Sequence, residues 1–451
     1  MGNEKNGYCY DEIVIEDKHY YLRAGEKEFL KEVNKYFPSE INNVIKYLDY
    51  VKEVSKKDIF FSLKILQCRP LAKVLSWILS KSFFKHTQET ALEVVKRYTT
   101  NTDLQAFLLG QFGDYGKTPS QESFFLHASI VNHYLNGAWF PKGGSSIIAK
   151  NIVPIIEKSG GRVLVRKAVD RIITVNNRAI GVEMINGDQI FAPTVISACG
   201  VPNTWKKLVP KELVPKSILS KIENLGLSCS FTYVFIGMEG SPQELELRSS
   251  NIWHWPNKNY DQMIEEFHKD PKIAPIPMFI GFPCSKDSTW NTRYPGKSNA
   301  VILTMSRFEE FEEWEHERPG KRSPEYQKLK QQYANRILEE GLYHYYPKTR
   351  GKVVYTEVGS PLTFNHYIGS QKGEVYGLNS KPLRFQHDDW LIPKTHIDGF
   401  YITGQDITTL GVTGAMMSGV LTAHSVLGYG TINDLLSGRN LIDDIIHLNK
   451  T

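Results

Sequence analysis

The sequence is poor in cysteine and has no cysteine motif. Its 451 residues include five cysteines, which are widely separated and never spaced as C-x-x-C: Cys9, Cys68, Cys199, Cys229 and Cys284. Scattered thiols in odd number argue against a disulfide framework, and the lack of clustered ligands argues against a structural zinc site. We therefore expect free thiols, no metal, and a fold that depends on its hydrophobic core.

The sequence also lacks a strong charge excess. Its 54 Lys and Arg residues against 49 Asp and Glu residues give a net charge of +5. No basic cluster stands out, so we expect no nucleic-acid partner. At roughly 100–200 residues per domain, the length predicts two or three domains.

No segment is typical of a signal peptide or of a membrane span. Residues 1–11 are polar and contain no apolar segment. Residues 59–84 are apolar but contain four Lys or Arg residues, which favours an amphipathic helix pair on a core or on a membrane surface. Residues 407–433 carry no Asp, Glu, Lys or Arg and could span on length alone, but their five glycines favour a buried, close-packed helix.

The N-terminal part of the chain predicts a hairpin followed by helices. Alternating apolar residues at 13–15 and 20–22 predict two strands that turn at Asp17-Lys18. From Gly25 to about Tyr134, apolar residues recur at helical spacing. A further helix is expected after the Pro141–Ser145 turn, with Ser145 or Ser146 as its N-cap.

The next segment predicts a nucleotide-binding sheet with an inserted meander. Short strands are expected at 163–165, 169–175, 179–185, 189–192 and 194–198, with turns at Asn176-Asn177 and at 186–188. The order of helix, strand, meander and strand fits a βαβ-type sheet.

The remainder of the chain mixes strands and helices. Residues 201–351 are rich in aromatic side chains. They predict strands at 230–236, 278–282 and 300–305, and helices at 308–317 and 326–345. A strand at 353–358, a strand at 400–403 and a helix at 411–427 follow.

The sharpest motif is the strand at 400–403, the tripeptide Gly404-Gln405-Asp406, and the helix that begins at Gly411. Gly404 allows close approach of a ligand to the backbone, and Asp406 can accept hydrogen bonds from hydroxyls such as those of a ribityl chain. The N-terminus of the helix favours a pyrophosphate or a flavin carbonyl. Small residues are expected to share one smooth helix face: Gly411, Gly414, Ala415, Ser418, Gly419, Thr422 and Ala423. The alternative is a capping Asp and tight helix packing.

Two weaker motifs accompany it. Gly137-Ala138 and Pro141–Ser145 place glycines before a helix, where backbone can approach a cofactor. Residues 195–200 form an apolar strand ending in small residues, as expected of a second nucleotide-contacting strand.

These blocks resemble the phytoene-desaturase and carotenoid-isomerase superfamily of flavoproteins, and within it the retinol-saturase family, over about residues 20–427. The blocks that carry the resemblance are Val131–Tyr134, Pro141–Ser146, Phe282-Pro283, Ser285–Asp287, Thr289-Trp290 and Gly404–Ile407.

The resemblance implies an FAD-dependent oxidoreductase of the endoplasmic-reticulum membrane that acts on CH–CH groups. It implies reduction of the 13,14 double bond of all-trans-retinol, with NAD or NADP as a candidate reductant. The polyene cis-trans isomerases of the superfamily are the alternative activity. The residues that match the FAD-contacting motif are Gly404, Gln405, Asp406, Gly411, Gly414, Ala415 and Ser418. The motif assigns no catalytic residue.

One family feature is missing. None of the 34 glycines forms the G-x-G-x-x-G turn that cradles the FAD pyrophosphate. We therefore expect a two-domain, Rossmann-like α/β flavoprotein without its first βαβ unit, reflecting an incomplete gene model, a splice form or a truncated paralogue. A non-catalytic remnant is the third functional alternative.

The predicted division follows these motifs. Residues 1–136 form the helical part of a substrate domain, and 137–200 form part of the FAD domain with its meander. Residues 201–351 form the mixed sheet and helices of the substrate domain, 352–430 return to the FAD domain, and 431–451 form a helical tail.

Reduction of a polyene also requires a proton donor. The candidates near the expected flavin are Tyr115, His127, His133 and Tyr134. The alternative for each is a structural role.

Overall fold

The computed structural model describes residues 7–56, 64, 74, 85–386, 390–428 and 430–437. The apolar segment 59–84 therefore lies outside the described residues, except for Lys64 and Val74. The described residues include the strand at 195–200 and the Gly404–Asp406 turn, the two motifs expected to flank the flavin site.

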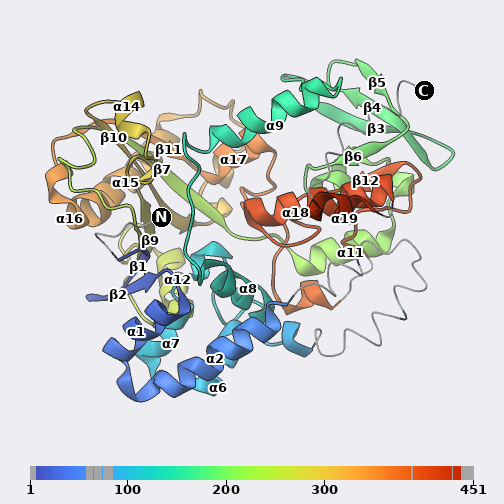
Figure 1. The fold of residues 1–451 in the computed structure, drawn as a ribbon. Helices are drawn as coiled ribbons and strands as arrows, with labels where there is room; N and C mark the ends of the chain where they lie inside the picture. Colours follow the sequence, from blue (N-terminus) through green and yellow to red (C-terminus); the bar gives the residue numbers. More distant parts are fainter. Residues whose placement is uncertain are drawn as a thin grey trace.

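A seven-stranded mixed sheet forms the framework of one half of the molecule (Figure 1). Its order is β11-β7-β10-β9-β8-β1-β2, and within it β1 runs parallel to β8. The predicted hairpin is confirmed, because β1 and β2 pair antiparallel with Ile15 opposite Lys18. The strands are β1 (Cys9–Ile15), β2 (Lys18–Arg23), β7 (Ser230–Glu239), β8 (Asn251–Trp255), β9 (Met278–Gly281), β10 (Lys297–Ser306) and β11 (Val353–Gly359).

Both faces of this sheet are covered. Side chains alternate along a strand, so Ile13 and Ile15 enter one hydrophobic cluster while Val14 enters another. The first cluster includes the predicted helical region, below the sheet in Figure 1: α1 (Glu26–Tyr36), α2 (Ile41–Val54), α6 (Ala91–Tyr98), α7 (Thr102–Leu109) and α8 (Phe124–Tyr134). Tyr260, Met263 and Ile264 of α12 (Tyr260–Lys269), a helix that was not predicted, join the same cluster. The second includes α15 (Pro324–Arg336) and the π-helical turn Ile337–Leu342.

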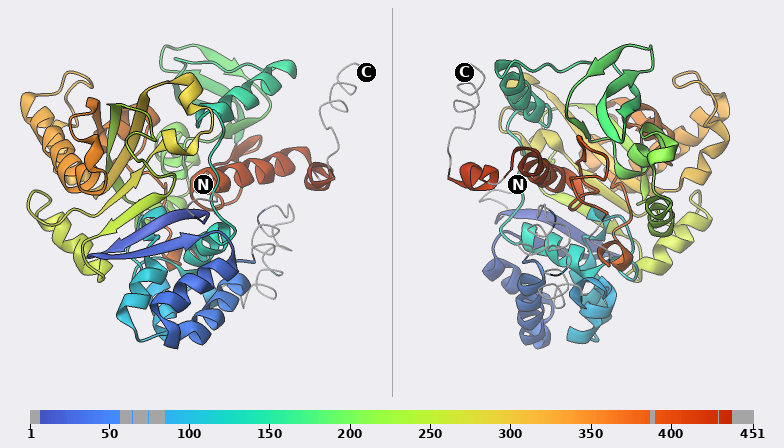
Figure 2. Two further views of the ribbon diagram at one scale, coloured as in Figure 1. Left: turned by 60° about the vertical axis from the view of Figure 1, so that its left-hand side comes forward. Right: turned by 90° about the vertical axis from the view of Figure 1, so that its right-hand side faces the viewer.

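The other half contains two small sheets. β6 (Val195–Ser197) and β12 (Phe400–Ile402) form a parallel pair. β3 (Val169–Val175), β4 (Arg178–Met184) and β5 (Gln189–Phe191) form the predicted antiparallel meander. Around them lie α9 (Ser146–Lys158), α10 (Val201–Asn203), α11 (Lys216–Leu225), α18 (Gly411–Leu427) and α19 (Thr431–Leu436). Figure 2 shows α18 running out from the body of the molecule.

Two sequence predictions are wrong. Residues 163–165 form no strand, because no described strand lies beside them to complete a hydrogen-bonded ladder. Residues 308–317 form two short 3-10 turns, Phe308–Glu310 and Glu312–Trp314, in place of a helix. The short helices α13 (Pro283–Lys286), α14 (Trp290–Arg293), α16 (Tyr343–Tyr345) and α17 (Pro361–Ile368) complete the described fold.

Two further observations bear on the sequence predictions. The predicted strand at 353–358 is β11, which pairs with β7 in the large sheet. None of the described helices combines the length and the apolar character that crossing a membrane requires.

Candidate flavin site

The site begins where β12 passes into α18. Gly404 follows the strand with φ of +104°, a conformation that favours glycine. Its N–H donates to Ser418 Oγ at 2.9 Å, and the hydroxyls of Thr403 and Ser418 lie 3.0 Å apart. Ser418 is fully buried, so it ties α18 to the end of the strand.

Gln405 joins the two sides of this turn. Its side-chain Nε2 donates to the carbonyl of Val375 at 3.3 Å, and its Oε1 accepts from the N–H of Gly411 at 3.2 Å. The side chain therefore fixes the first turn of α18 against the segment that contains Val375.

Asp406 is buried and held by backbone donors. Its Oδ2 accepts from Val201 N–H and its Oδ1 from Leu378 N–H, both at 2.8 Å. A Cβ at Gly377 would lie 2.2 Å from Oδ1, so this approach requires glycine. Each oxygen retains a further acceptor position, and Asp406 also lines the adjacent cavity.

Arg384 is the residue of this loop that the sequence did not reveal. Its buried guanidinium donates to the carbonyls of Leu378, Gln405 and Asp406 at 2.8, 3.0 and 3.0 Å. Two of these charge-assisted hydrogen bonds hold the Gly404–Asp406 turn, and the third ties it to Leu378. No local pattern marks Arg384, because its partners are backbone carbonyls that are close only in the folded chain.

The predicted small side of α18 is divided between a buried row and an exposed row. Gly414, Ser418 and Thr422 are buried, and the Thr422 hydroxyl donates to the carbonyl of Ile402 in β12. Ala415 and Gly419 are exposed on another side of the helix. At about 100° per residue, positions 414, 418 and 422 form one row, and 415 and 419 form the next. One row therefore packs on the strand and the other is accessible.

Gly414 has a specific packing role. A Cβ at this position would lie 1.6 Å from the carbonyl oxygen of Thr409. The Thr408 hydroxyl also donates to the carbonyl of Gly414 at 2.6 Å. Only glycine lets the loop close this tightly over the helix.

A small cavity lies between β6 and the Gly404–Asp406 turn. Its volume is about 160 Å³, and its walls include Ala198, Cys199, Gly200, Gly404, Gln405 and Asp406. The strand that ends at residues 195–200 is thus brought to the same place as the β12 turn, as predicted. The Pro141–Ser145 turn instead contacts the large-sheet half, since Gly143 N–H donates to Asp287 at 3.1 Å.

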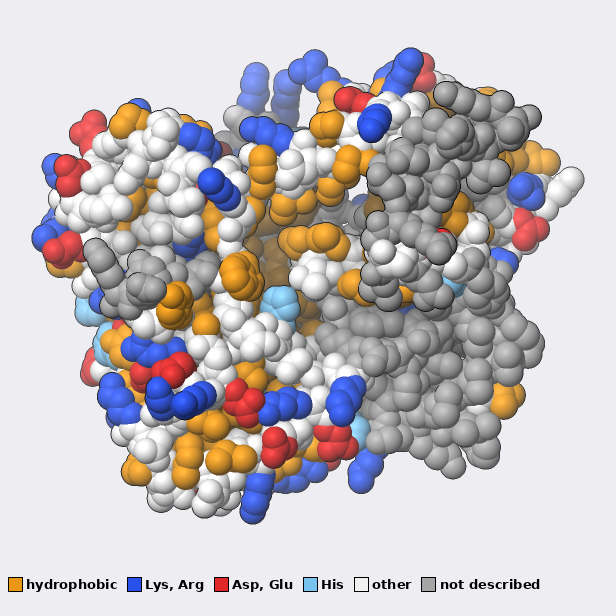
Figure 3. Space-filling model, in the orientation of Figure 1, with side chains coloured by type: hydrophobic (Ala, Val, Ile, Leu, Met, Phe, Trp, Pro, Cys, Tyr) orange, Lys and Arg blue, Asp and Glu red, His pale blue; other side chains and the backbone are white. Residues whose placement is uncertain are grey.

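An apolar hollow opens between the two halves (Figure 3). Hydrophobic side chains gather there, in the region where Figure 1 places α8, β7 and α18. Partly buried side chains packed on the first cluster include Tyr134, Tyr233, Phe279, Val375, Tyr376 and Leu410. Val375 and Leu410 adjoin Gln405 and Gly411, which brings this apolar surface beside the turn.

Asp114 is the unexpected polar group of this region. Burial, followed by the nearby charge of Asp11, raises the pKa of Asp114 well above its usual range. Asp114 in turn is the main cause of a raised pKa at Tyr134 and also raises that of Tyr376. Tyr134 stacks on Tyr10 with ring centroids 5.9 Å apart. A carboxyl whose pKa is raised in this way holds its proton to higher pH than an exposed carboxyl, as a proton donor requires.

Two of the predicted proton donors are already engaged. His127 Nε2 lies 2.7 Å from the Tyr47 hydroxyl and its Nδ1 lies 3.3 Å from the Tyr115 hydroxyl. Burial lowers the pKa of His127 to about 3, so this neutral ring packs in the helical core with Tyr115. His133 is exposed on α8, while Tyr134 lies beside Asp114.

Comparison with known proteins identifies the fold. The family model described as flavin containing amine oxidoreductase matches residues 11–427. The chain belongs to this flavin-containing oxidoreductase family. Wild-type putrescine oxidase bound to putrescine superposes with a TM-score of 0.57 at 13% identity, covering 93% of this chain and 81% of that chain. The predicted α/β flavoprotein fold is confirmed.

Three curated relatives refine the comparison. All-trans-retinol 13,14-reductase of Danio rerio is 36% identical over 93% of this chain and 72% of its own length. A protein of the same organism named inactive all-trans-retinol 13,14-reductase is 30% identical over 96% of this chain and 74% of its own length. The chloroplastic prolycopene isomerase of Daucus carota is 24% identical over 88% and 63%. The similarity to the reductase exceeds the similarity to the isomerase.

The residues of this flavoprotein fit the flavin part of FAD. At Gly404 no described side chain covers the Cβ side of the backbone, and the first turn of the 17-residue α18 lies next to this glycine. The accessible row of α18 begins with the small residues Ala415 and Gly419. A helix N-terminus and close backbone approach favour an electron-rich flavin edge.

Proposed function

We propose that this FAD-dependent oxidoreductase reduces the 13,14 double bond of all-trans-retinol. The observation that carries the proposal is Asp114, a carboxyl whose pKa is raised by burial and which lies near the aromatic side chains of Tyr134 and Tyr376. The similarity to the reductase named above supports the substrate class.

The predicted FAD-binding residues divide into two roles. We propose that Gly404, Gln405, Gly411 and Ala415 contact the flavin, because they border the turn or the accessible side of α18. We assign Asp406, Gly414 and Ser418 to holding these contacts in position, since their hydrogen bonds and close contacts are with this chain.

The protein's own side chains would exclude water, align the substrate and deliver the proton. The apolar wall that contains Tyr233, Phe279 and Tyr376 excludes water and aligns a linear polyene. FAD, when bound and reduced, supplies a hydride to one carbon of the double bond. Asp114 delivers a proton to the neighbouring carbon, and Tyr134 positions that carboxyl. A nicotinamide dinucleotide, NAD or NADP, supplies the two electrons for the next turnover.

Product mass tests the reaction. Protein supplied with FAD, NADPH and all-trans-retinol should give a product two hydrogens heavier than the substrate. A product of unchanged mass would replace reduction with polyene isomerisation. Absence of bound flavin absorbance after FAD addition would favour the non-catalytic alternative, for which the relative named inactive, at 30% identity, is a precedent.

Replacement of one carboxyl tests the proton donor. Asp114→Asn should lower turnover about 10²–10⁴-fold, because an amide cannot act as the general acid. Activity of the unchanged enzyme should fall at high pH, where a carboxyl with a raised pKa loses its proton. Asp170→Asn, on an exposed position of β3, is the matched control. Equal turnover in the Asp114→Asn and Asp170→Asn variants would exclude Asp114.

A membrane location is a separate proposal. A retinol-reducing enzyme would take its apolar substrate from a bilayer, so we propose association with the surface of the endoplasmic-reticulum membrane. Flotation with liposomes should bring the protein to the lipid fraction, and recovery in the dense fraction would contradict the proposal.

A further inference from the structure

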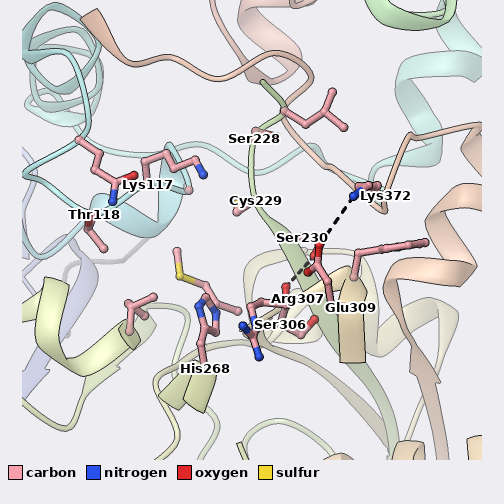
Figure 4. Close-up of a pocket in the computed structure, with 16 residues that line it drawn as sticks. Lys117, Thr118, Ser228, Cys229, Ser230, His268, Ser306, Arg307, Glu309 and Lys372 are labelled. Atoms are coloured by element: carbon pink, nitrogen blue, oxygen red, sulfur yellow. Dashed lines mark hydrogen bonds and ion pairs between the residues drawn. The ribbon is translucent and has the colours of Figure 1, made fainter. Parts of the chain in front are cut away.

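A second cavity lies on the other side of the chain segment that borders the flavin turn. Its volume is about 410 Å³ (Figure 4). Ser370, Glu374, Val375 and Gly377 border the small flavin-side cavity, whereas Lys372 and residues 227–230 border the large one. Val375 N–H donates to the carbonyl of Cys229 at 3.1 Å, so the two segments form a shared wall. The large cavity is therefore separate from the site already described.

Three cations from three different parts of the chain surround this cavity. Lys117 follows α7, Arg307 follows β10, and Lys372 follows α17. The only carboxylate among its described lining residues is Glu309, whose Oε1 lies 3.8 Å from Lys372 Nζ. The net charge of the lining is thus 3 − 1 = +2.

Two of these cations form no close ion pair with a described residue, although the charges of Glu122 and Glu310 act on Lys117 and Arg307 from a greater distance. Within the part of the chain that the structure describes, neither Lys117 nor Arg307 forms a salt bridge. Figure 4 shows them on different sides of the cavity, with His268 near Arg307. Unpaired cations that face a common space attract an anion.

Buried polar atoms without partners add to this arrangement. Thr118 is 7% exposed, and its hydroxyl has no hydrogen-bond partner among the described residues. The same holds for Nε2 of His268. Burial, then the charges of Arg307 and Lys117, lowers the pKa of His268 to about 4, so the ring is neutral. An unsatisfied buried polar group is costly, and a ligand that bonds to it removes that cost.

The remaining wall is apolar. It includes Leu227, Ile264, Met305 and Phe308. A cavity of this size lies within the range of about 300–1,000 Å³ that organic ligands occupy. The occupant therefore combines an anionic group with an organic body.

We propose that this cavity binds an organic phosphate, with the phosphate between Lys117, Arg307 and Lys372 and the organic body against Ile264, Met305 and Phe308. A phosphate monoester carries about −1.5 to −2 at neutral pH, which matches a lining of +2, whereas a carboxylate carries −1. Arg and Lys are the side chains that phosphate groups prefer.

Calorimetry with AMP tests the proposal on the full chain, with adenosine as the uncharged control and decanoate as the carboxylate. AMP should bind, adenosine should bind at least tenfold more weakly, and added NaCl should weaken AMP binding. Arg307→Gln and Lys117→Gln should each weaken AMP binding about tenfold, since each removes a charge-assisted contact. Lys216→Gln, an exposed position of α11, should leave it unchanged.

A third variant separates binding from folding. Thr118→Val removes the unpartnered hydroxyl at similar volume. It should weaken AMP binding while the melting temperature stays the same or rises. No AMP binding, equal affinity for AMP and adenosine, stronger binding of decanoate than of AMP, or unchanged AMP affinity in the three cavity variants would each overturn the proposal. None of these measurements depends on retinol turnover, so the reductase proposal stands or falls separately.

Discussion

The large-sheet half buries its apolar side chains more completely than the flavin half, which has a small core around Phe400 but leaves the apolar side of one helix exposed. In the half built on the seven-stranded sheet, Phe282 and Ile302 are fully buried. In the flavin half, the apolar side of α9 is exposed: Ile148 by 39%, Ile152 by 47%, Ile155 by 52% and Ile156 by 38%. Helical spacing of apolar residues alone does not decide burial, because burial also requires an opposing surface.

The difference has a structural reason. The large sheet has a hydrophobic cluster on each face, so side chains such as Ile13 and Ile302 are enclosed by partners. The flavin half has a parallel pair of short strands, and Val163, Leu164 and Val165 extend past it without a ladder, 48%, 53% and 79% exposed. Equal substitutions in the two halves should therefore have unequal effects.

The largest effect is expected in the core of the large-sheet half. Phe282→Ala should lower the free energy of unfolding by about 3–5 kcal/mol, because it leaves a cavity beside Tyr346, whose ring lies 4.6 Å away. Urea denaturation followed by tryptophan fluorescence measures this loss. The control is Phe235→Ala, at a position that is 43% exposed. Equal losses in both variants would refute the contrast between packed and open positions.

A smaller effect is expected at α18. Gly414→Val should lower the free energy of unfolding by about 1–3 kcal/mol, because the new side chain displaces Thr409. Since Thr409 adjoins the flavin turn, FAD affinity should fall too.

Gly419→Ala on the same helix is the matched control for that variant. A Cβ there meets no atom within 4 Å. The change should stabilise the helix by about 0.5–1 kcal/mol. Retention of full FAD affinity by the Gly414→Val variant would refute the packing role of this glycine.

A third effect is expected in the free energy of unfolding, which should change gradually with pH. Burial raises the pKa of Glu122 to about 8 from 4.5 in the unfolded chain. The folded state therefore favours the protonated carboxyl, and its contribution is complete below pH 4.5 and is lost as pH rises to about 8. The slope is at most about 1.4 kcal/mol per pH unit.

Glu122→Gln should remove that slope. The free energy of unfolding, measured by urea denaturation between about pH 5 and about 8, should fall with pH in the unchanged protein and stay flatter in the variant. Glu212→Gln, at an exposed position, should keep the original slope. A slope that persists in the Glu122→Gln variant would assign the effect to another group.

The smallest effect is expected on α9. Ile152→Ser should change the free energy of unfolding by no more than about 0.5 kcal/mol, because this side chain makes few buried contacts. The same change at Ile302, in β10, should cost several times more. A large loss at Ile152 would show that a surface covers α9 in solution.

Much of the fold could be predicted from local patterns. The hairpin, the meander, β12 and the limits of α18 at Gly411 and Leu427 coincide with predicted elements, because alternation, turn residues and glycine signals act over a few residues. Residues 163–165 were predicted as a strand on equal grounds, but a strand depends on a neighbour that periodicity does not reveal. The predicted domain boundaries remain predictions.

The candidate site was predicted in part. Gly404, Gln405 and Asp406 do lie together with the end of β6, as the strand-end argument expects. Arg384 and Asp114 were not predicted, because a guanidinium bonded to distant carbonyls and a half-buried carboxyl near aromatic rings have no local signature.

The sequence by itself determined the family and marked the Gly404–Asp406 turn that we propose contacts the flavin. Glycines, small side chains and one carboxylate at fixed spacing are needed wherever backbone approaches a cofactor, so they stand out along the chain. Tertiary structure alone decided which side of α18 is accessible, which carboxyls have a raised pKa, and which cations gather around a second cavity. These properties depend on burial and on distances between remote segments, and neither exists before the chain is folded.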